Sequence, residues 1–342
     1  MSDIFAQRNE HTEKTIGRLV QSMNNQLGVE QGVLIGEHTC VYSTGSCGRM
    51  EMGRGSDLDA YVVRVDGGEH TNGEKITNAV KTANDTAGLP PLDGEGKYLE
   101  MEKAADFLDL LGEPRDDESG VLTKRMLLLL ESRVLVGGVA YQALLNEVID
   151  AYWQNEDLHP DDYLPIVLVN DIVRYWRIVL LNHESRLRAK GKKFASDALV
   201  APEDEEALLL AERRYRSYKL RLPRCLTCFS ALTYLLALTP SEPAHVSKDD
   251  VRTMIGLPPI ERLRRLPEMV ERDLEQVDSL LSLYSTYLER TDEGKQHLVE
   301  QLIRDSATQT SVSREGRDFT KHMFDLVQDL GGGRTLHRHM LV

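Results

Sequence analysis

The sequence has few cysteines, with four in 342 residues. Cys225 and Cys228 form a single C-x-x-C pair inside an apolar stretch, and no second pair follows it. A zinc site of the double C-x-x-C type needs that second pair. We therefore expect both residues to lie in the core of a helix, and the low cysteine content favours a reduced, cytoplasmic protein.

Long apolar segments are also missing. The first 14 residues, MSDIFAQRNEHTEK, lack the apolar core of a signal peptide, so export is not expected. The longest uncharged run covers residues 225–240, which is shorter than the roughly 20 residues of a membrane-spanning helix. The run predicts a buried helix, and we expect no association with a membrane.

Basic charge is in deficit, because 41 lysines and arginines face 55 acidic residues and the net charge is -14. Proteins that hold a long duplex tightly need many cationic contacts with phosphates, so this class is disfavoured. A small nucleotide or a short, locally docked strand stays compatible with the composition. With 41% apolar residues, the chain is large enough for two domains.

The most informative stretch is TCVYSTGSCGRMEMGRGSDLDAYVVR, residues 39–64. A short strand is expected to end at the sharp turn Gly45-Ser46, and a flexible, glycine-rich spacer of nine residues then leads to Ser56. Side chains alternate along a strand, so Asp57 and Asp59 should share one face while Leu58 enters the core. Two carboxylates beside a small turn suit a site for Mg²⁺ and phosphate.

The pattern G-S-x(n)-S-D-x-D resembles the signature of the polymerase-β-like nucleotidyltransferase superfamily. The resemblance covers only some twenty residues. It implies that Asp57 and Asp59 hold Mg²⁺, with Mn²⁺ as an alternative, and that Gly45, Ser46 and Ser56 receive a nucleoside triphosphate. Arg49, in the spacer, is a further candidate for phosphate contact, and the alternative for it is a solvated arginine.

The resemblance also implies a third carboxylate on a neighbouring strand. In KYLEME, residues 97–102, Glu100 is our choice for this catalytic and metal-binding role, with Glu102 second. An aspartate is commoner at this position in the superfamily. The alternative is that both glutamates are exposed strand residues.

A second cluster of charge lies at RRYRSYKLRLPR, residues 213–224, which holds six cations and two tyrosines. Several branches of the superfamily have a helical C-terminal domain that offers lysine and arginine to the triphosphate. By this resemblance Lys219 and Arg224 would bind phosphate. The alternative is a basic helix face that pairs with the surplus acids.

The pattern of elements predicts an α+β protein: a small, mixed-sheet nucleotidyltransferase domain at residues 1–135 and an all-α, substrate-binding domain at 136–342. An amphipathic helix is expected at 7–28, packed under the first strand. Beyond residue 106 the chain is expected to turn helical, and from residue 141 onward almost all elements are expected to be helices. A polar loop is expected at SATQTSVSREG, residues 306–316, before a last helix.

These features predict a Mg²⁺-dependent transfer of a nucleoside monophosphate to a hydroxyl acceptor. The favoured product is a nucleotide or short oligonucleotide, such as a signal in antiviral defence, with a short nucleic acid or a protein hydroxyl as acceptor. The alternatives are a tRNA- or protein-modifying, toxin-like enzyme and a catalytically silent, nucleotide-binding regulator. Both self-association and a partner protein stay compatible with the sequence.

Overall fold

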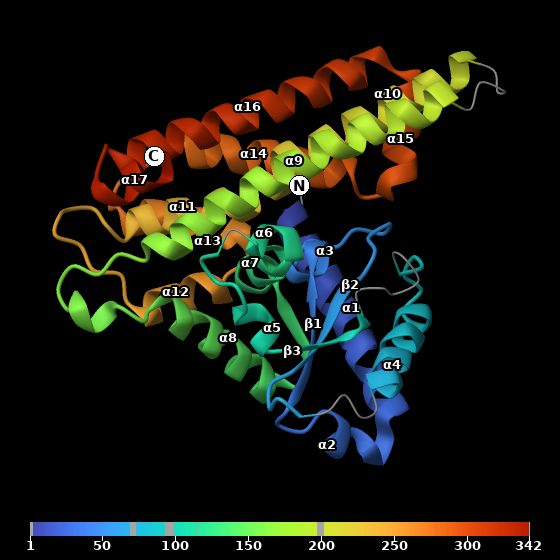
Figure 1. The fold of residues 1–342 in the computed structure, drawn as a ribbon. Coiled ribbons are helices and arrows are strands. Elements are labelled where there is room, and N and C mark those ends of the chain that lie inside the picture. The colour runs from blue at the N-terminus through green and yellow to red at the C-terminus, as the bar shows by residue number, and fades with distance from the viewer. Residues whose placement is uncertain (1–2, 69–72, 93–98, 114, 197–201, 342) are drawn as a thin grey trace. The chain divides into compact units, whose positions relative to one another are not determined.

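The computed structural model describes residues 3–68, 73–92, 99–113, 115–196 and 202–341, without the side chains of 186–205. It is an α+β structure with a small mixed sheet and many helices (Figure 1). The chain forms two compact units: Met1–Val167 with Ser247–Pro258, and Leu168–Val246 with Pro259–Val342. The boundary expected near residue 135 falls inside strand β4 (Arg133–Val136), so the first unit is longer than predicted.

The sheet of the first unit has the strand order β3-β2-β1-β4. Strand β1 (Thr39–Thr44) pairs antiparallel with β2 (Asp59–Arg64) and with β4, while β2 pairs parallel with β3 (Met101–Lys103). The register places Thr44 opposite Asp59, at the end of β1 and the start of β2. The connection from Thr44 to Asp59 therefore begins and ends at one edge of the sheet.

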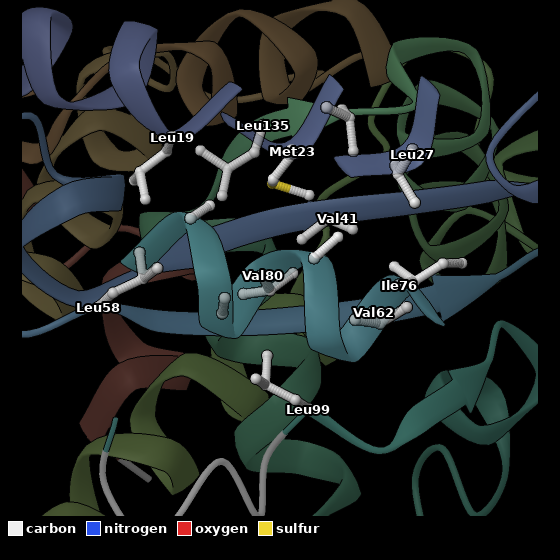
Figure 2. Close-up of a cluster of buried hydrophobic side chains, with 14 of the residues drawn as sticks. Leu19, Met23, Leu27, Val41, Leu58, Val62, Ile76, Val80, Leu99 and Leu135 are labelled. Carbon is white, nitrogen blue, oxygen red and sulfur yellow. The ribbon is translucent and has the colours of Figure 1, made fainter. Parts of the chain in front are cut away.

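Two helices, α1 (Ile4–Leu27) and α4 (Gly73–Thr86), pack against each other and cover one face of this sheet. Their apolar residues meet those of the strands in one cluster, in which Leu19 and Met23 lie above Val41 and Val62 (Figure 2). Val41 and Val62 are cross-strand partners, so both belong to this face. The predicted N-terminal helix is confirmed, although it starts three residues earlier.

The other face of the sheet carries α7 (Val121–Glu131) and α8 (Gly138–Tyr152). Tyr42 of β1 stacks on Tyr61 of β2 with 5.4 Å between ring centroids, and Tyr141 of α8 lies 5.8 Å from Tyr42. Because α8 buries its aromatic side chain on the sheet, the unit continues past residue 135. The remaining short helices of this unit are η1 (Gly28–Glu30), α2 (Gln31–Leu34), α3 (Gly45–Gly48), α5 (Ala105–Leu108), α6 (Asp116–Ser119), η3 (Glu156–Leu158) and α12 (Lys248–Gly256).

The second unit is helical in its described part. Its helices are α9 (Ile166–Ser196), which begins two residues before the unit, α10 (Pro202–Lys219), the π-helical turn η4 (Leu220–Arg224), α11 (Cys225–Ala237), α13 (Pro259–Met269), α14 (Glu275–Arg290), α15 (Gly294–Arg304), α16 (Ser306–Gly331) and α17 (Thr335–Leu341). Helix α11 is almost entirely buried, with both Cys225 and Cys228 inside it, as the apolar run predicts. Over the ranges given above, no helix is both apolar and long enough to cross a bilayer.

The polar loop expected at residues 306–316 is wrong, because this segment forms the first half of α16. Asp305 caps the helix by accepting hydrogen bonds from the amides of Ala307 (2.9 Å) and Thr308 (3.0 Å). Serine and threonine hydroxyls along the helix donate to carbonyls one turn earlier, as Thr310 does to Ser306. A strong cap and these local bonds outweigh the low helix propensity of the segment.

A buried ion pair fixes α6 to α7 in the first unit. The Arg125 guanidinium bonds to the Asp116 carboxylate, and it also donates to the Tyr152 hydroxyl (2.7 Å) and to the Phe107 carbonyl (3.0 Å). Both charged side chains are fully buried. Burial alone would lower the pKa of Arg125, but Tyr152 and Asp116 raise it above its ordinary value, so the guanidinium stays charged.

Removing Asp116 should therefore destabilise the first unit strongly, since Arg125 would stay buried without its counter-charge. We expect Asp116→Ala to lower the free energy of unfolding by about 3–5 kcal/mol. The exposed Asp109 offers a matched control, and Asp109→Ala should change stability by less than about 0.5 kcal/mol. Urea unfolding followed by circular dichroism measures both, and equal midpoints for the two variants would contradict the structural role of the pair.

The buried thiols should resist alkylation until the protein unfolds. Burial raises the pKa of Cys40 and Cys225 to about 12 and that of Cys47 to about 11. At pH 8 the reactive thiolate of Cys47 is then about one thousandth of the total. Peptide mapping after iodoacetamide treatment should find these three cysteines labelled in urea and unlabelled in buffer; fast native labelling of Cys47 would contradict this burial.

Candidate functional site

The two halves of the sequence motif meet in the first unit. Strand β1 ends at Thr44, and Gly45 then takes a left-handed conformation with φ +64°. A Cβ atom placed on Gly45 would lie only 2.7 Å from Oδ2 of Asp59. The Asp59 carboxylate therefore lies directly against the backbone of the turn, because glycine leaves that space open.

The alternation predicted for Ser56 to Asp59 is consistent with the burial of these residues. Leu58 is 3% exposed and belongs to the apolar cluster (Figure 2). Asp57 is exposed and Asp59, the first residue of β2, is half-buried. Ser46, in the turn, is also half-exposed. The exposed Asp57 and the half-exposed Ser46 thus lie on either side of the contact between the turn and the Asp59 carboxylate.

The spacer between the two halves is held by ion pairs, where the sequence predicts a flexible segment. Arg49 is buried and donates to Glu51 (2.7 Å) and to Glu131 (2.6 Å), the last residue of α7. Gly48 lies so close to α7 that its Cβ would fall 1.9 Å from the Glu131 carbonyl oxygen. The Arg49 side chain is committed to two carboxylates, so a contact with phosphate would require it to leave them.

The rest of the spacer is also bonded to its surroundings. The Met52 amide donates to the Thr12 hydroxyl of α1 (2.9 Å), and the Gly53 amide donates to the Ser56 hydroxyl (2.9 Å). A Cβ on Gly53 would collide with the Arg8 guanidinium. Ser56 therefore closes the turn that leads into the acidic pair, which is a local role besides the expected contact with substrate.

One cation near the site, Arg133, is not among the residues predicted from the sequence. Burial raises the pKa of Cys47, the Arg133 charge opposes this rise, and the Asp59 charge adds to it. Arg133 begins β4, where it is paired with Ser43. No strand is predicted for residues 133–136, although valines at 134 and 136 before Gly137-Gly138 are a strand signal that could have found this element.

The third carboxylate is the least supported part of the predicted site. Glu100 is exposed and lies one residue before β3. Glu102 is paired with Val63, four residues along β2 from Asp59, which is about 13 Å at 3.3 Å per residue. Both Glu102 oxygens accept from Lys124 Nζ, at 2.6 and 2.7 Å, so Glu102 is outside the site. In the described ranges, no group of three or more His, Cys, Asp or Glu residues is placed to hold a metal ion.

Lys219 and Arg224 belong to the second unit. Lys219 is the last residue of α10, and its ammonium lies 5.8 Å from the centre of the Tyr215 ring. Arg224 ends the π-helical turn η4 and is half-buried. Their expected contact with phosphate stays a prediction.

No family model, curated protein or solved structure matches this chain. Asp57 and Asp59 supply the oxygen ligands that Mg²⁺ prefers, and one or two carboxylates with substrate phosphates are a common Mg²⁺ site. The open space at Gly45 lets a phosphate approach the backbone closely.

Glycine-to-alanine substitutions test the contact between Gly45 and Asp59, because the same change should have opposite effects on stability at two positions. Gly45→Ala adds a methyl group at 2.7 Å from Asp59 Oδ2 and at a positive φ, so it should destabilise the first unit by about 1–2 kcal/mol or more. Gly17→Ala, in an open position of α1, should stabilise the same unit by about 0.5–1 kcal/mol. Urea denaturation measures both changes, and a neutral or stabilising Gly45→Ala would show that the carboxylate does not press on the turn.

Proposed function

We propose that this protein is a Mg²⁺-dependent nucleotidyltransferase, which moves a nucleoside monophosphate from a nucleoside triphosphate to a hydroxyl. One observation supports the proposal: the Asp59 carboxylate lies against the Gly45 backbone, so one member of the acidic pair meets the small turn. The resemblance of the motif at residues 45–59 to polymerase-β-like nucleotidyltransferases supports the same activity.

Each residue of the site then has a stated role. Asp57 and Asp59 hold the metal ion through their carboxylates, and Leu58 anchors both by its burial between them. The backbone at Gly45 and the Ser46 hydroxyl orient the triphosphate. When bound, Mg²⁺ or Mn²⁺ supplies positive charge to the phosphate oxygens and makes an attacking hydroxyl more acidic.

In the transfer, the acceptor oxygen forms a bond to the α-phosphorus and the bond from this phosphorus to the pyrophosphate oxygen breaks. The acceptor proton leaves to a base, and pyrophosphate departs with the electron pair. Glu100 is our proposal for the residue that helps to remove this proton. It is exposed, one residue before the strand that pairs with β2, and is therefore accessible to an acceptor.

For the acceptor, we propose a nucleotide or a short oligonucleotide, with a signal in antiviral defence as the corresponding biological role. The net charge of -14 supports a small acceptor over a long duplex. Transfer to tRNA or to a protein hydroxyl is the alternative within the same reaction class.

A second candidate, a catalytically silent regulator that binds a nucleotide, is favoured by one observation. No third carboxylate of the described ranges joins Asp57 and Asp59. Such a protein would bind ATP with Mg²⁺ through the same two aspartates and release no pyrophosphate.

Incubation with each of the eight α-labelled ribo- and deoxyribonucleoside triphosphates, with Mg²⁺ or Mn²⁺, tests the transferase. We expect label in short products or on the protein, and a loss of about 10²–10³-fold in Asp57→Asn and Asp59→Asn, which corresponds to about 3–4 kcal/mol of charge stabilisation. Asp85→Asn, an exposed acid of α4, is the matched control and should keep full activity.

The outcomes separate the candidates. Label that persists in both aspartate variants would refute the proposed site. If tRNA or another added acceptor is needed before label appears, the class holds and the acceptor changes. Metal-dependent binding of ATP, seen by calorimetry and lost in the aspartate variants, without any transfer would favour the silent regulator.

A further inference from the structure

The second unit contains a cavity of about 330 Å³ between α10, η4 and α16. Its size is at the lower end of small-molecule sites. Helix α16 contributes to it because residues 306–316 are helical, so this cavity could not be foreseen from the sequence. Its polar lining consists of Arg213, Arg214, Ser217, Arg221, Ser313 and Arg317, besides Tyr218, whose hydroxyl donates to Glu315 (2.6 Å).

The four arginines of the cavity have no acidic partner among the described side chains, which exclude those of residues 186–205. Two acids nearby, Glu315 and Glu212, are already paired with other groups. Glu315 accepts from the Tyr218 hydroxyl (2.6 Å) and from Arg290 (2.9 Å), and Glu212 pairs with Lys295 (3.1 Å). In a chain with a large surplus of acids, four clustered arginines without a counter-charge are unlike the paired arginines around them.

The backbone holds one of these arginines in place. A Cβ on Gly316 of α16 would lie 3.0 Å from Cδ of Arg221, so the glycine makes room for the arginine stem. Arg221 lies on the π-helical turn, which contains Pro223 and therefore lacks one regular helix hydrogen bond. Turns of this kind occur often at functional sites, because they re-aim side chains.

The arginine charges also act on the pKa of a neighbouring histidine, His183. Burial lowers the pKa of His183 on α9, and Arg216, Arg213 and Arg221 lower it further, against the opposing effect of Glu184. Ser217 lies at hydrogen-bond distance from His183 Nε2, at 3.4 Å. A positive field therefore extends over this part of the unit.

We propose that this cavity binds a compact polyphosphate group, either as inorganic polyphosphate or as the triphosphate of a nucleotide. Four guanidinium groups match the roughly four negative charges of a triphosphate, and arginine can grip phosphate oxygens with two parallel hydrogen bonds. The Ser217 hydroxyl adds a neutral donor, while that of Ser313 already donates to the Gln309 carbonyl (2.8 Å). The proposal stands on residues of the second unit alone and goes beyond the transferase site.

Calorimetric titration of the full chain with sodium tripolyphosphate tests the cavity, in EDTA so that no metal site contributes. Arg213→Gln/Arg317→Gln removes one charge from each of two helices at exposed positions, so folding should be retained. We expect the Kd to rise at least about tenfold. Arg265→Gln/Arg304→Gln removes the same charge from exposed positions outside the lining and should change the Kd less than about twofold.

Equal weakening in both double variants would overturn the proposal, because it would reveal only a general attraction of anions. Absence of binding by the wild type at millimolar tripolyphosphate would overturn it too. Asp57→Asn/Asp59→Asn should leave binding intact; if these substitutions abolish it while the arginine variants do not, the anion binds in the first unit.

A competition experiment with ATP, adenosine and tripolyphosphate identifies the source of the phosphate. ATP that competes with tripolyphosphate and binds more tightly would assign the cavity to a nucleotide. Tripolyphosphate that binds as tightly as ATP, with no competition by adenosine, would assign it to inorganic polyphosphate. Either result supports the cavity even if the transferase assay fails, since neither readout depends on catalysis.

Discussion

The carboxylate of Asp59 occupies the space that any side chain at position 45 would need. This contact exists because the antiparallel register places Thr44 opposite Asp59. A shift by one residue would exchange the two faces of β2 and send the carboxylate toward the apolar cluster. The register is held by packing on both faces, by α1 and α4 on one side and by the stacked tyrosines 42, 61 and 141 on the other. The candidate site therefore depends on the core beneath it.

The sequence predicted the parts of the fold that follow from local patterns. Helix α1, the strand–turn–strand around Gly45 and the burial of Leu58 come from helical spacing, a turn signal and strict alternation. Strand β4 was missed because four residues directly after a long apolar helix give too short a pattern to separate strand from helix. The start of α16 was missed because a cap and tertiary contacts override composition there.

The site was predictable where neighbours in sequence make it, and unpredictable where distant residues do. Arg49 was expected to face phosphate, yet it meets Glu131, which lies 82 residues further along the chain. Such a pairing follows from topology, which composition does not encode. Arginine is the buried partner of an acid in the first unit, whereas four arginines of the second unit line a cavity without an acidic partner among the described side chains.

The anchoring of the spacer, residues 47–55, bears on the rate at which a ligand would bind. Arg49 is tied to α7, and the Met52 amide to α1, so the loop that leads from the turn to the acidic pair is ordered before any ligand arrives. A ligand that binds there need not supply the conformational entropy of ordering this loop, which would cost about 1–2 kcal/mol for each residue fixed. Association would then be governed by diffusion and by the charges of the site, and the strength of the two anchors would set how long the site keeps its shape between encounters.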